Sequence, residues 1–275
     1  MKRHPATLAG TIVSAVAIMS VTVIASFSAH AQEFDFGDFN FISVEDEISM
    51  GREMSAEVEK EHPLYADGQV QRYVRDIGGR IARYVPKNAR IPLTVKVVKD
   101  DEVNAFTIPG GYVYVNSGLI KRLDTEAELA GVIAHEMAHA VNRDGTKQLT
   151  RMYGISFMLN LVLGSDAPQW QQIVGDLFST FGLLSYGRAA ESEADRGAVY
   201  ISRAAGYNPV GYLDFLKKLQ EMEESQPNLL TELFSTHPEI SGRITTVERE
   251  IAALPPTKRL INNTARFDSI RRRVR

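Results

Sequence analysis

Two histidines four residues apart, in the segment His-Glu-Met-Ala-His at 135–139, constrain this chain more than any other feature. Four residues of an α-helix turn through about 400°, so His135 and His139 would lie on one face. Glu136 directly follows the first histidine. In this arrangement two imidazoles grip one Zn²⁺ ion while the carboxylate reaches a metal-bound water. The spacing therefore predicts a helix that carries most of a hydrolytic zinc site, rather than two unrelated histidines on a buried helix.

The residues that precede and surround the histidines favour the same helix. Thr125 and Glu128 have the spacing of a capping box, in which two side chains satisfy free N–H groups at a helix start. Apolar residues then recur at helical intervals: Leu129, Val132, Ile133 and Met137. These signals do not depend on the histidines, so they strengthen the prediction of a zinc-binding helix.

The first 31 residues have the pattern of a secretory signal. Lys2 and Arg3 form a basic start, and an uncharged apolar stretch covers 8–27. Ala29 and Ala31 then stand at the two positions that a signal peptidase reads. We expect cleavage after Ala31 and a mature chain that is soluble, exported and periplasmic. The alternative is an uncleaved membrane anchor, which the several Ser, Thr and Gly residues of the stretch make weak.

Composition narrows the partners and the ligands. The formal net charge is −3, which gives no case for a nucleic-acid partner. The sequence contains no cysteine, so disulfides and thiolate ligands are excluded. Without the signal, four histidines remain as imidazole ligands: His62, His135, His139 and His237.

The mature chain divides into three predicted parts. An acidic, aromatic stretch at 32–42 reads as a flexible lead-in, and 43–254 reads as the metallopeptidase domain. The last part, 255–275, is a basic tail with an amphipathic pattern of arginines and apolar residues: Arg266, Phe267, Ile270, Arg271, Arg272, Arg273, Val274 and Arg275. It is a candidate for peripheral contact with anionic lipid or an acidic partner, and a frayed, solvated terminus is the alternative.

The domain pattern predicts an α+β fold that is mostly helical. Residues 94–98 have the β-branched character of a strand, and 105–116 read as a hairpin around Pro109-Gly110-Gly111. Helical patterns occupy the remainder, so the sheet is small. The apolar segment 152–164 is too short to cross a bilayer. A buried helix is the first interpretation, and a lid over the site or a membrane-touching face is the second.

A third metal ligand must come from outside the first motif. Gly145 and Asn142 stand where a metzincin would have its third histidine and a glycine, so that class is excluded. Glu191 and Asp195 are four residues apart and share a helix face, whereas Glu193 points roughly opposite. We predict that Glu191 binds the metal and that Asp195 accepts the free ring N–H of a ligating histidine. The alternative is a solvated acidic turn.

Three segments together resemble a known family. They are His-Glu-Met-Ala-His at 135–139, Glu-Ser-Glu-Ala-Asp-Arg-Gly at 191–197 and Asn-Ala-Phe-Thr-Ile-Pro-Gly-Gly at 104–111. Over 43–253 the chain is similar to the HtpX and CAAX-prenyl-protease family of zinc metallopeptidases, and most to its soluble, exported, BepA-like branch. The resemblance implies a zincin-like fold with one Zn²⁺ per chain. We expect neither HtpX-type transmembrane helices nor the tetratricopeptide domain of BepA-like members.

The same resemblance implies roles for His237 and for the hairpin. His237, in a Thr-His-Pro setting, is expected near the metal as a donor to the developing oxyanion. There are two alternatives for His237. It could close the site as a fourth metal ligand in a latent form, or it could have a purely structural role. His62 lies in a similar His-Pro pair, where we expect only a loop role. Arg188 and Arg196 flank the acidic motif as electrostatic support or as structural ion pairs.

The hairpin edge at 104–114 is the expected substrate-binding element, bordering the active-site cleft. An edge strand binds an extended peptide through main-chain hydrogen bonds, with little regard to sequence. The predicted substrate-binding residues are Asn104, Ala105, Phe106 and Tyr112. A structural hairpin without substrate contact is the alternative.

These features predict a zinc-dependent endopeptidase. Glu136 is the expected general base and His237 the second catalytic residue. The expected substrates are unfolded or misassembled exported proteins, which suggests periplasmic quality control. The rival hypothesis is a holdase that keeps the fold and does not cut; the carboxylate of Glu136 argues against it, since a structural zinc site has no use for one.

Overall fold

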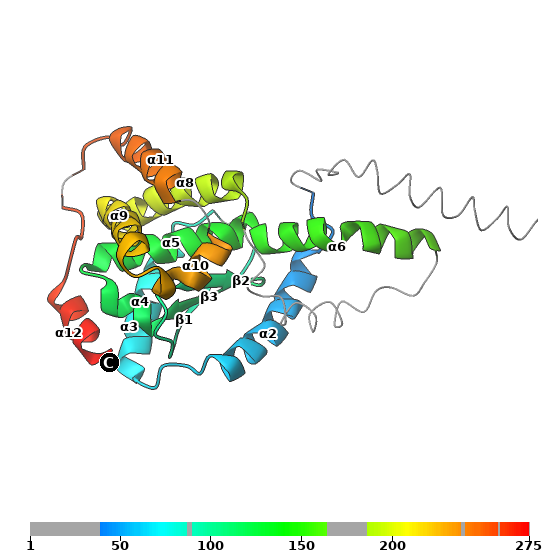
Figure 1. Ribbon diagram of the computed structural model, residues 1–275, viewed down its shortest axis with the longest axis horizontal. Coiled ribbons are helices and arrows are strands. Elements are labelled where there is room, and N and C mark those ends of the chain that lie inside the picture. Colours follow the sequence, from blue (N-terminus) through cyan, green and yellow to red (C-terminus); the bar gives the residue numbers. More distant parts are fainter. Residues whose placement is uncertain (1–38, 87–89, 164–185, 238–239, 258, 275) are drawn as a thin grey trace, which may run out of the picture. The chain divides into compact units, whose positions relative to one another are not determined.

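A computed structural model describes residues 39–86, 90–163, 186–237, 240–257 and 259–274. The predicted signal peptide and residues 32–38 of the predicted lead-in lie outside these residues. The elements occur in this order (Figure 1): α2 Val44–Glu61, α3 Gly68–Ile81, β1 Thr94–Val98, β2 Ala105–Ile108, β3 Tyr112–Asn116, α4 Ser117–Arg122, α5 Glu126–Asn142, α6 Asp144–Leu163, α8 Arg188–Ala204, α9 Val210–Ser225, a 3₁₀ turn Pro227–Leu230, α10 Thr231–Thr236, α11 Ile240–Ala252 and α12 Ala265–Arg273. The mostly helical α+β prediction is confirmed.

The sheet of the described region has the strand order β1-β3-β2. β2 and β3 are antiparallel and form the predicted hairpin, while β1 is parallel to β3. Gly110 and Gly111 both have φ of 82° in the turn, a conformation that side chains other than glycine rarely adopt. Because β3 pairs on both sides, the edge of this sheet that belongs to the hairpin is β2 alone.

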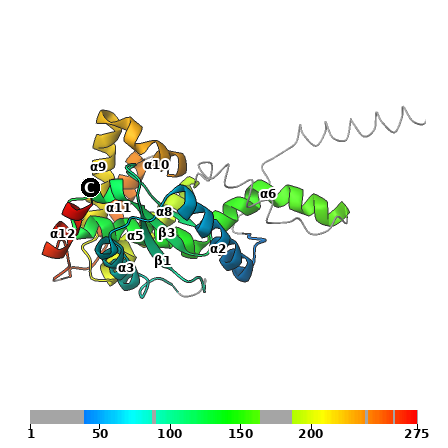
Figure 2. The same cartoon turned by 90° about the horizontal axis from the view of Figure 1, so that it is seen from below.

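The two faces of the sheet bury different helices. On one face, Ile108 and Tyr114 pack with Met50 and Met54 of α2. On the other face, Val113 and Val115 join the main core together with α3 and α5. Figure 1 shows α8, α9 and α11 grouped on one side of α5, and Figure 2 turns the same arrangement by 90°. Helix α5 is therefore enclosed between the sheet and a layer of helices.

Helix α5 begins with the capping box that the sequence predicts. The Thr125 hydroxyl accepts from the Glu128 N–H at 3.2 Å, and the Glu128 carboxylate accepts from the Asp124 N–H at 3.0 Å. A Cβ on Gly131 would lie 2.6 Å from the Cβ of Tyr212, so glycine lets α9 approach α5 closely. This contact brings a tyrosine of α9 to the histidines of α5.

The C-terminal segment packs against the domain. Phe267, Ile270 and Val274 are buried in the main core, and α12 lies against α3 and α4. Arg266 and Arg273 form ion pairs with Asp76 and Asp67 of the domain. The alternative of a frayed, solvated terminus is therefore wrong, and the apolar face of the predicted amphipathic pattern is already covered.

The segment 152–163 lies in helix α6, as predicted, and residue 164 lies outside the described region. Met152, at the start of this segment, is 41% exposed, and Gly154 is buried. The side chains from residue 155 onwards lie outside the described residues, and with them the choice between core helix, lid and membrane-touching face. Within the described ranges, no helix is both long enough and apolar enough to span a membrane.

Candidate metal centre

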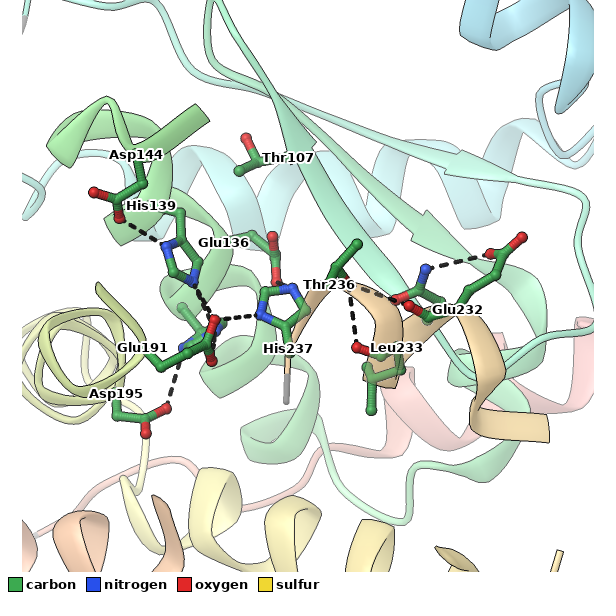
Figure 3. A network of polar contacts seen from close by, with 12 residues as sticks. Thr107, Glu136, His139, Asp144, Glu191, Asp195, Glu232, Leu233, Thr236 and His237 are labelled. Atoms are coloured by element: carbon green, nitrogen blue, oxygen red, sulfur yellow. Dashed lines mark hydrogen bonds and ion pairs between the residues drawn. The ribbon is translucent and has the colours of Figure 1, made fainter. Parts of the chain in front are cut away.

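Four buried side chains from three parts of the chain converge on one point (Figure 3). His135 and His139 come from α5, Glu191 comes from the first turn of α8, and His237 follows the last residue of α10. One ligand atom from each lies within 4.8 Å of all the others. The structure thus brings together the three predicted metal ligands and the predicted catalytic histidine.

Hydrogen bonds orient both rings of α5 so that their Nε2 atoms face the centre. His139 Nδ1 lies 2.8 Å from the Asp144 carboxylate, and His135 Nδ1 lies 2.9 Å from the Tyr212 hydroxyl and 3.3 Å from Asp195. A carboxylate only accepts hydrogen bonds, so each Nδ1 carries a proton and Nε2 is the nitrogen of each ring that can bind a metal. The two Nε2 atoms are 3.1 Å apart. At that distance the two atoms can share a proton in a hydrogen bond, and a metal ion bound by both would take the place of that proton.

The α8 carboxylates occupy the places that the sequence pattern predicts. Glu191 Oε1 lies 3.3 Å from His139 Nε2 and 2.8 Å from His237 Nδ1. Asp195 Oδ1 lies 3.3 Å from His135 Nδ1, the ring nitrogen that is not among the converging atoms. Glu193 and Arg196 are exposed on α8, so the structure favours Glu191 over Glu193 as the ligand. Arg188 opens the same helix and lines a cavity of about 240 Å³ beside Glu191 and Asp195.

Electrostatics within the site favour a cation. Burial lowers the pKa of His135 to about 3, which keeps the ring neutral and free to bind a metal. Burial also acts on His139, but hydrogen bonds to Asp144 and Glu191 raise its pKa to about 10. The carboxylates thus favour positive charge on the His139 ring, and a divalent metal ion bound at Nε2 would supply it in place of a proton. Burial alone would raise the pKa of Glu191. The neighbouring His237, His139 and Arg243 outweigh this effect, lower the pKa and keep the carboxylate ionised.

Glu136 lies beside the convergent ligands. Its Oε1 is 3.6 Å from His237 Nε2, and burial raises the pKa of its carboxyl. Glu136 Oε2 and His237 Nε2 are buried and have no hydrogen-bond partner among the described residues. Unpartnered buried polar atoms are rare in folded proteins and usually mark the place of a ligand or water. The donor set and these two atoms fit a zinc ion with a reacting water.

Four contributors were not predicted from the sequence. Asp144 follows Arg143, whose left-handed conformation (φ 58°) ends α5 and turns the chain back towards His139. The position of Asp144, two residues after the end of α5 and five after His139, could have indicated that its carboxylate supports this histidine. Tyr212, Arg243 and Tyr186 come from distant segments, and no local pattern marks them. The Tyr186 ring stacks on His139, with 4.1 Å between ring centroids, and helps to bury the site.

The predicted substrate-binding residues separate into two groups. Ala105 lines a cavity of about 20 Å³ that His135 and Glu136 also line, and Asn104 is buried 3.4 Å from Glu232 of α10. Phe106 and Tyr112 pack instead with the α2 cluster, on the opposite face of the sheet. Their side chains therefore do not face the metal centre.

The minor predictions have simple structural counterparts. His62 caps the end of α2 and lies 3.1 Å from Asp100, which fits the expected loop role. Arg196 bonds a carbonyl of its own helix.

Comparisons with known proteins agree with this geometry. The model of peptidase family M48 matches residues 68–251. The chain is 26% identical over 226 residues to the beta-barrel assembly-enhancing protease of Yersinia pestis, covering 78% of this chain and 46% of that protein. It is 27% identical over 214 residues to the protein of the same name from Escherichia coli K12, covering 74% and 43%. It is also 34% identical over 148 residues to the mitochondrial metalloendopeptidase OMA1 of Arabidopsis thaliana, covering 52% and 28%.

The chain spans less than half the length of these curated relatives. The family match, however, covers most of the described domain and includes both α5 and the acidic pair of α8. Family M48 peptidases use zinc, and the buried cluster here has the ligands to hold it. On this evidence the chain belongs to peptidase family M48.

Proposed function

We propose that this protein is a zinc-dependent endopeptidase that cuts unfolded or misassembled exported proteins. The observation that carries the proposal is the convergence of two histidine Nε2 atoms and the Glu191 carboxylate beside Glu136, which has an unpartnered oxygen. Its relatives named for beta-barrel assembly support a quality-control role. Residues 1–31 support export to the periplasm through their signal-peptide pattern.

The reaction needs a proton acceptor and a proton donor at the same place. Zinc held by His135, His139 and Glu191 would polarise a substrate carbonyl and lower the pKa of a bound water to about 7. Burial raises the pKa of the Glu136 carboxyl, and a carboxylate with a raised pKa is a stronger proton acceptor. Glu136 then takes the proton of the attacking water and returns it to the leaving amine.

Among the described residues no strand pairs with the outer edge of β2, and this edge is the proposed platform for the substrate. The Asn116 N–H donates to the Asn104 carbonyl, so the alternation of an antiparallel pair turns the main-chain groups of Ala105 and Thr107 away from β3. The β1 edge is covered instead, because Val97 bonds the Tyr65 N–H and the Gln71 carboxamide. An extended peptide would therefore add to β2, beside the cavity that Ala105 shares with Glu136.

His237 has two proposed roles, and they predict opposite results. As a donor to the oxyanion it raises turnover, so His237→Ala would slow cleavage without releasing zinc. As a closing fourth ligand it blocks the site, so the same substitution would speed cleavage and weaken zinc binding. The structure supports closure, because Glu136 and His237 are each only 2% exposed. Unchanged turnover and zinc affinity would remove His237 from both roles.

Glu136→Gln tests the proposed function. Since the substitution keeps the shape of the side chain and removes the base, it should retain zinc and fold. Cleavage of casein should fall by about 10²–10⁴-fold, the usual contribution of a general base. If the wild-type protein suppresses aggregation of an unfolded substrate and cleaves none, the holdase hypothesis is favoured. Full cleavage by Glu136→Gln would contradict the mechanism.

A further inference from the structure

We propose that Arg243 is a positioning residue of the metal centre, which fixes Glu191 so that one carboxylate oxygen faces the metal. This inference rests on the zinc site of the proposed function. Arg243 lies on α11, outside the two helices α5 and α8 that carry the proposed metal ligands, and it is 8% exposed. A nearly buried guanidinium beside metal ligands needs a reason, because burying a charge is costly unless it is paired.

The two oxygens of Glu191 have different neighbours. Oε1 faces the imidazoles, 2.8 Å from His237 Nδ1 and 3.3 Å from His139 Nε2. Oε2 lies 2.9 Å from Nη1 of Arg243, and the two groups form an ion pair without a hydrogen bond between them. The guanidinium thus holds one oxygen and leaves the other directed at the centre.

The remaining nitrogens of Arg243 secure the support of His135. Nη2 donates to Asp195 Oδ1 at 2.8 Å and to the Tyr212 hydroxyl at 2.7 Å, and Nε lies 3.1 Å from Asp195 Oδ2. Asp195 and Tyr212 are the groups that orient the His135 ring. Nη2 also lies 3.3 Å from His135 Nε2, its longest contact. One planar group therefore fixes a metal ligand and the support of a second ligand.

Charge balance gives the second reason for arginine. The described centre buries four carboxylates, Glu136, Asp144, Glu191 and Asp195. The Arg243 guanidinium forms ion pairs with two of them, Glu191 and Asp195. A lysine would supply the charge but not the planar fork that reaches both Glu191 and Asp195. Charge and geometry can therefore be separated by substitution.

The experiment compares Arg243→Gln and Arg243→Lys with Arg249→Gln. Arg249 lies on the same helix, and its 68% exposed side chain pairs only with a neighbouring residue, so it is a matched control. The zinc dissociation constant is measured by competition with a chromogenic chelator. Cobalt-substituted protein gives a visible absorption spectrum that reports ligand geometry. Circular dichroism identifies the folded variants, and kcat and KM are measured on the zinc-loaded fraction.

Arg243→Gln should weaken zinc binding by about 10–100-fold, as loss of outer-shell partners does. Arg243→Lys should lie between this variant and wild type, with an altered cobalt spectrum and a fall in kcat rather than a rise in KM. Arg249→Gln should match wild type. Wild-type zinc affinity and spectrum in a folded Arg243 variant would overturn the proposal, even if thermal stability fell. If Arg243→Gln does not fold, Arg243→Lys decides alone. These metal readouts do not require cleavage, so they remain informative if the proposed activity is absent.

Discussion

Helix α5 buries Glu126 in its first turn and Glu136 in its second half, and the two carboxylates differ in how completely they are hydrogen-bonded. At the N-terminal end, Glu126 accepts hydrogen bonds from the Tyr73 hydroxyl at 2.7 Å and the Tyr207 hydroxyl at 3.1 Å. The Thr264 hydroxyl also donates to it. These bonds join the start of α5 to α3, to the chain before α9 and to the segment that leads into α12. Both carboxylate oxygens of Glu126 are thus partnered by protein groups.

In the second half of α5, the metal centre buries two polar atoms that have no hydrogen-bond partner among the described residues, one from α5 and one from the residue that follows α10. Glu136 Oε2 and His237 Nε2 have no hydrogen-bond partner there, although both residues are almost inaccessible. Such an atom costs about 1–3 kcal/mol unless a ligand or water compensates. The comparison distinguishes two uses of a buried carboxylate. Glu126, with hydrogen bonds to both oxygens, stabilises the fold, whereas Glu136, with an unpartnered oxygen, marks a place for a ligand or water.

The largest effect is expected from Glu191→Ala. Because Glu191 is the proposed acidic ligand, its loss should weaken zinc binding by more than the roughly 10–100-fold typical of outer-shell partners. Glu193→Ala is the matched control, since Glu193 is two residues away and exposed. Equilibrium dialysis with zinc measures both variants. Loss of zinc in Glu193→Ala and not in Glu191→Ala would reverse the assignment.

A smaller effect on the same site is expected from Asp144→Asn. The substitution keeps the shape next to His139 Nδ1 but removes the charge that fixes this ring. Zinc affinity should fall by about 10–100-fold with the fold intact. Asp46→Asn, in the exposed first turn of α2, controls for loss of an acidic residue at a helix start. Equal zinc affinity in both variants would mean that Asp144 does not support the metal centre.

Substitution of Glu126, which Tyr73, Tyr207 and Thr264 surround, should change stability and leave zinc affinity unchanged. Glu126→Gln places an amide N–H₂ where hydroxyl groups donate, so the free energy of unfolding should fall by about 1–3 kcal/mol. Zinc affinity should not change. Glu45→Gln, in the exposed first turn of α2, controls for the helix dipole. Chemical denaturation and chelator competition give the two values. A loss of zinc affinity in Glu126→Gln would erase the distinction between the two clusters.

Local spacing explains which parts of the site could be predicted. His135, His139 and Glu136 follow from one helical turn, and the pair of Glu191 and Asp195 follows from another. The hairpin follows from its turn of proline and two glycines. Each of these signals lies within a few residues, where backbone geometry alone fixes the relation between side chains.

The rest depends on packing between distant segments. Tyr212 and Arg243 reach His135 from positions 77 and 108 residues away. The parallel pairing of β1 with β3 makes β3 central, so Tyr112 is not on the free edge that the hairpin pattern suggested. The packing of α12 against the domain could not be predicted either, because an amphipathic pattern does not indicate which surface covers the apolar face.

Zinc content and zinc X-ray absorption of the mature chain, compared with the double variant His135→Ala/His139→Ala, test the central claim most directly. We predict one zinc per wild-type chain, with nitrogen and oxygen ligands at about 2.0–2.2 Å, and none in the double variant. Wild-type protein that binds no zinc when zinc is supplied, or a double variant that retains the same spectrum, would contradict the account.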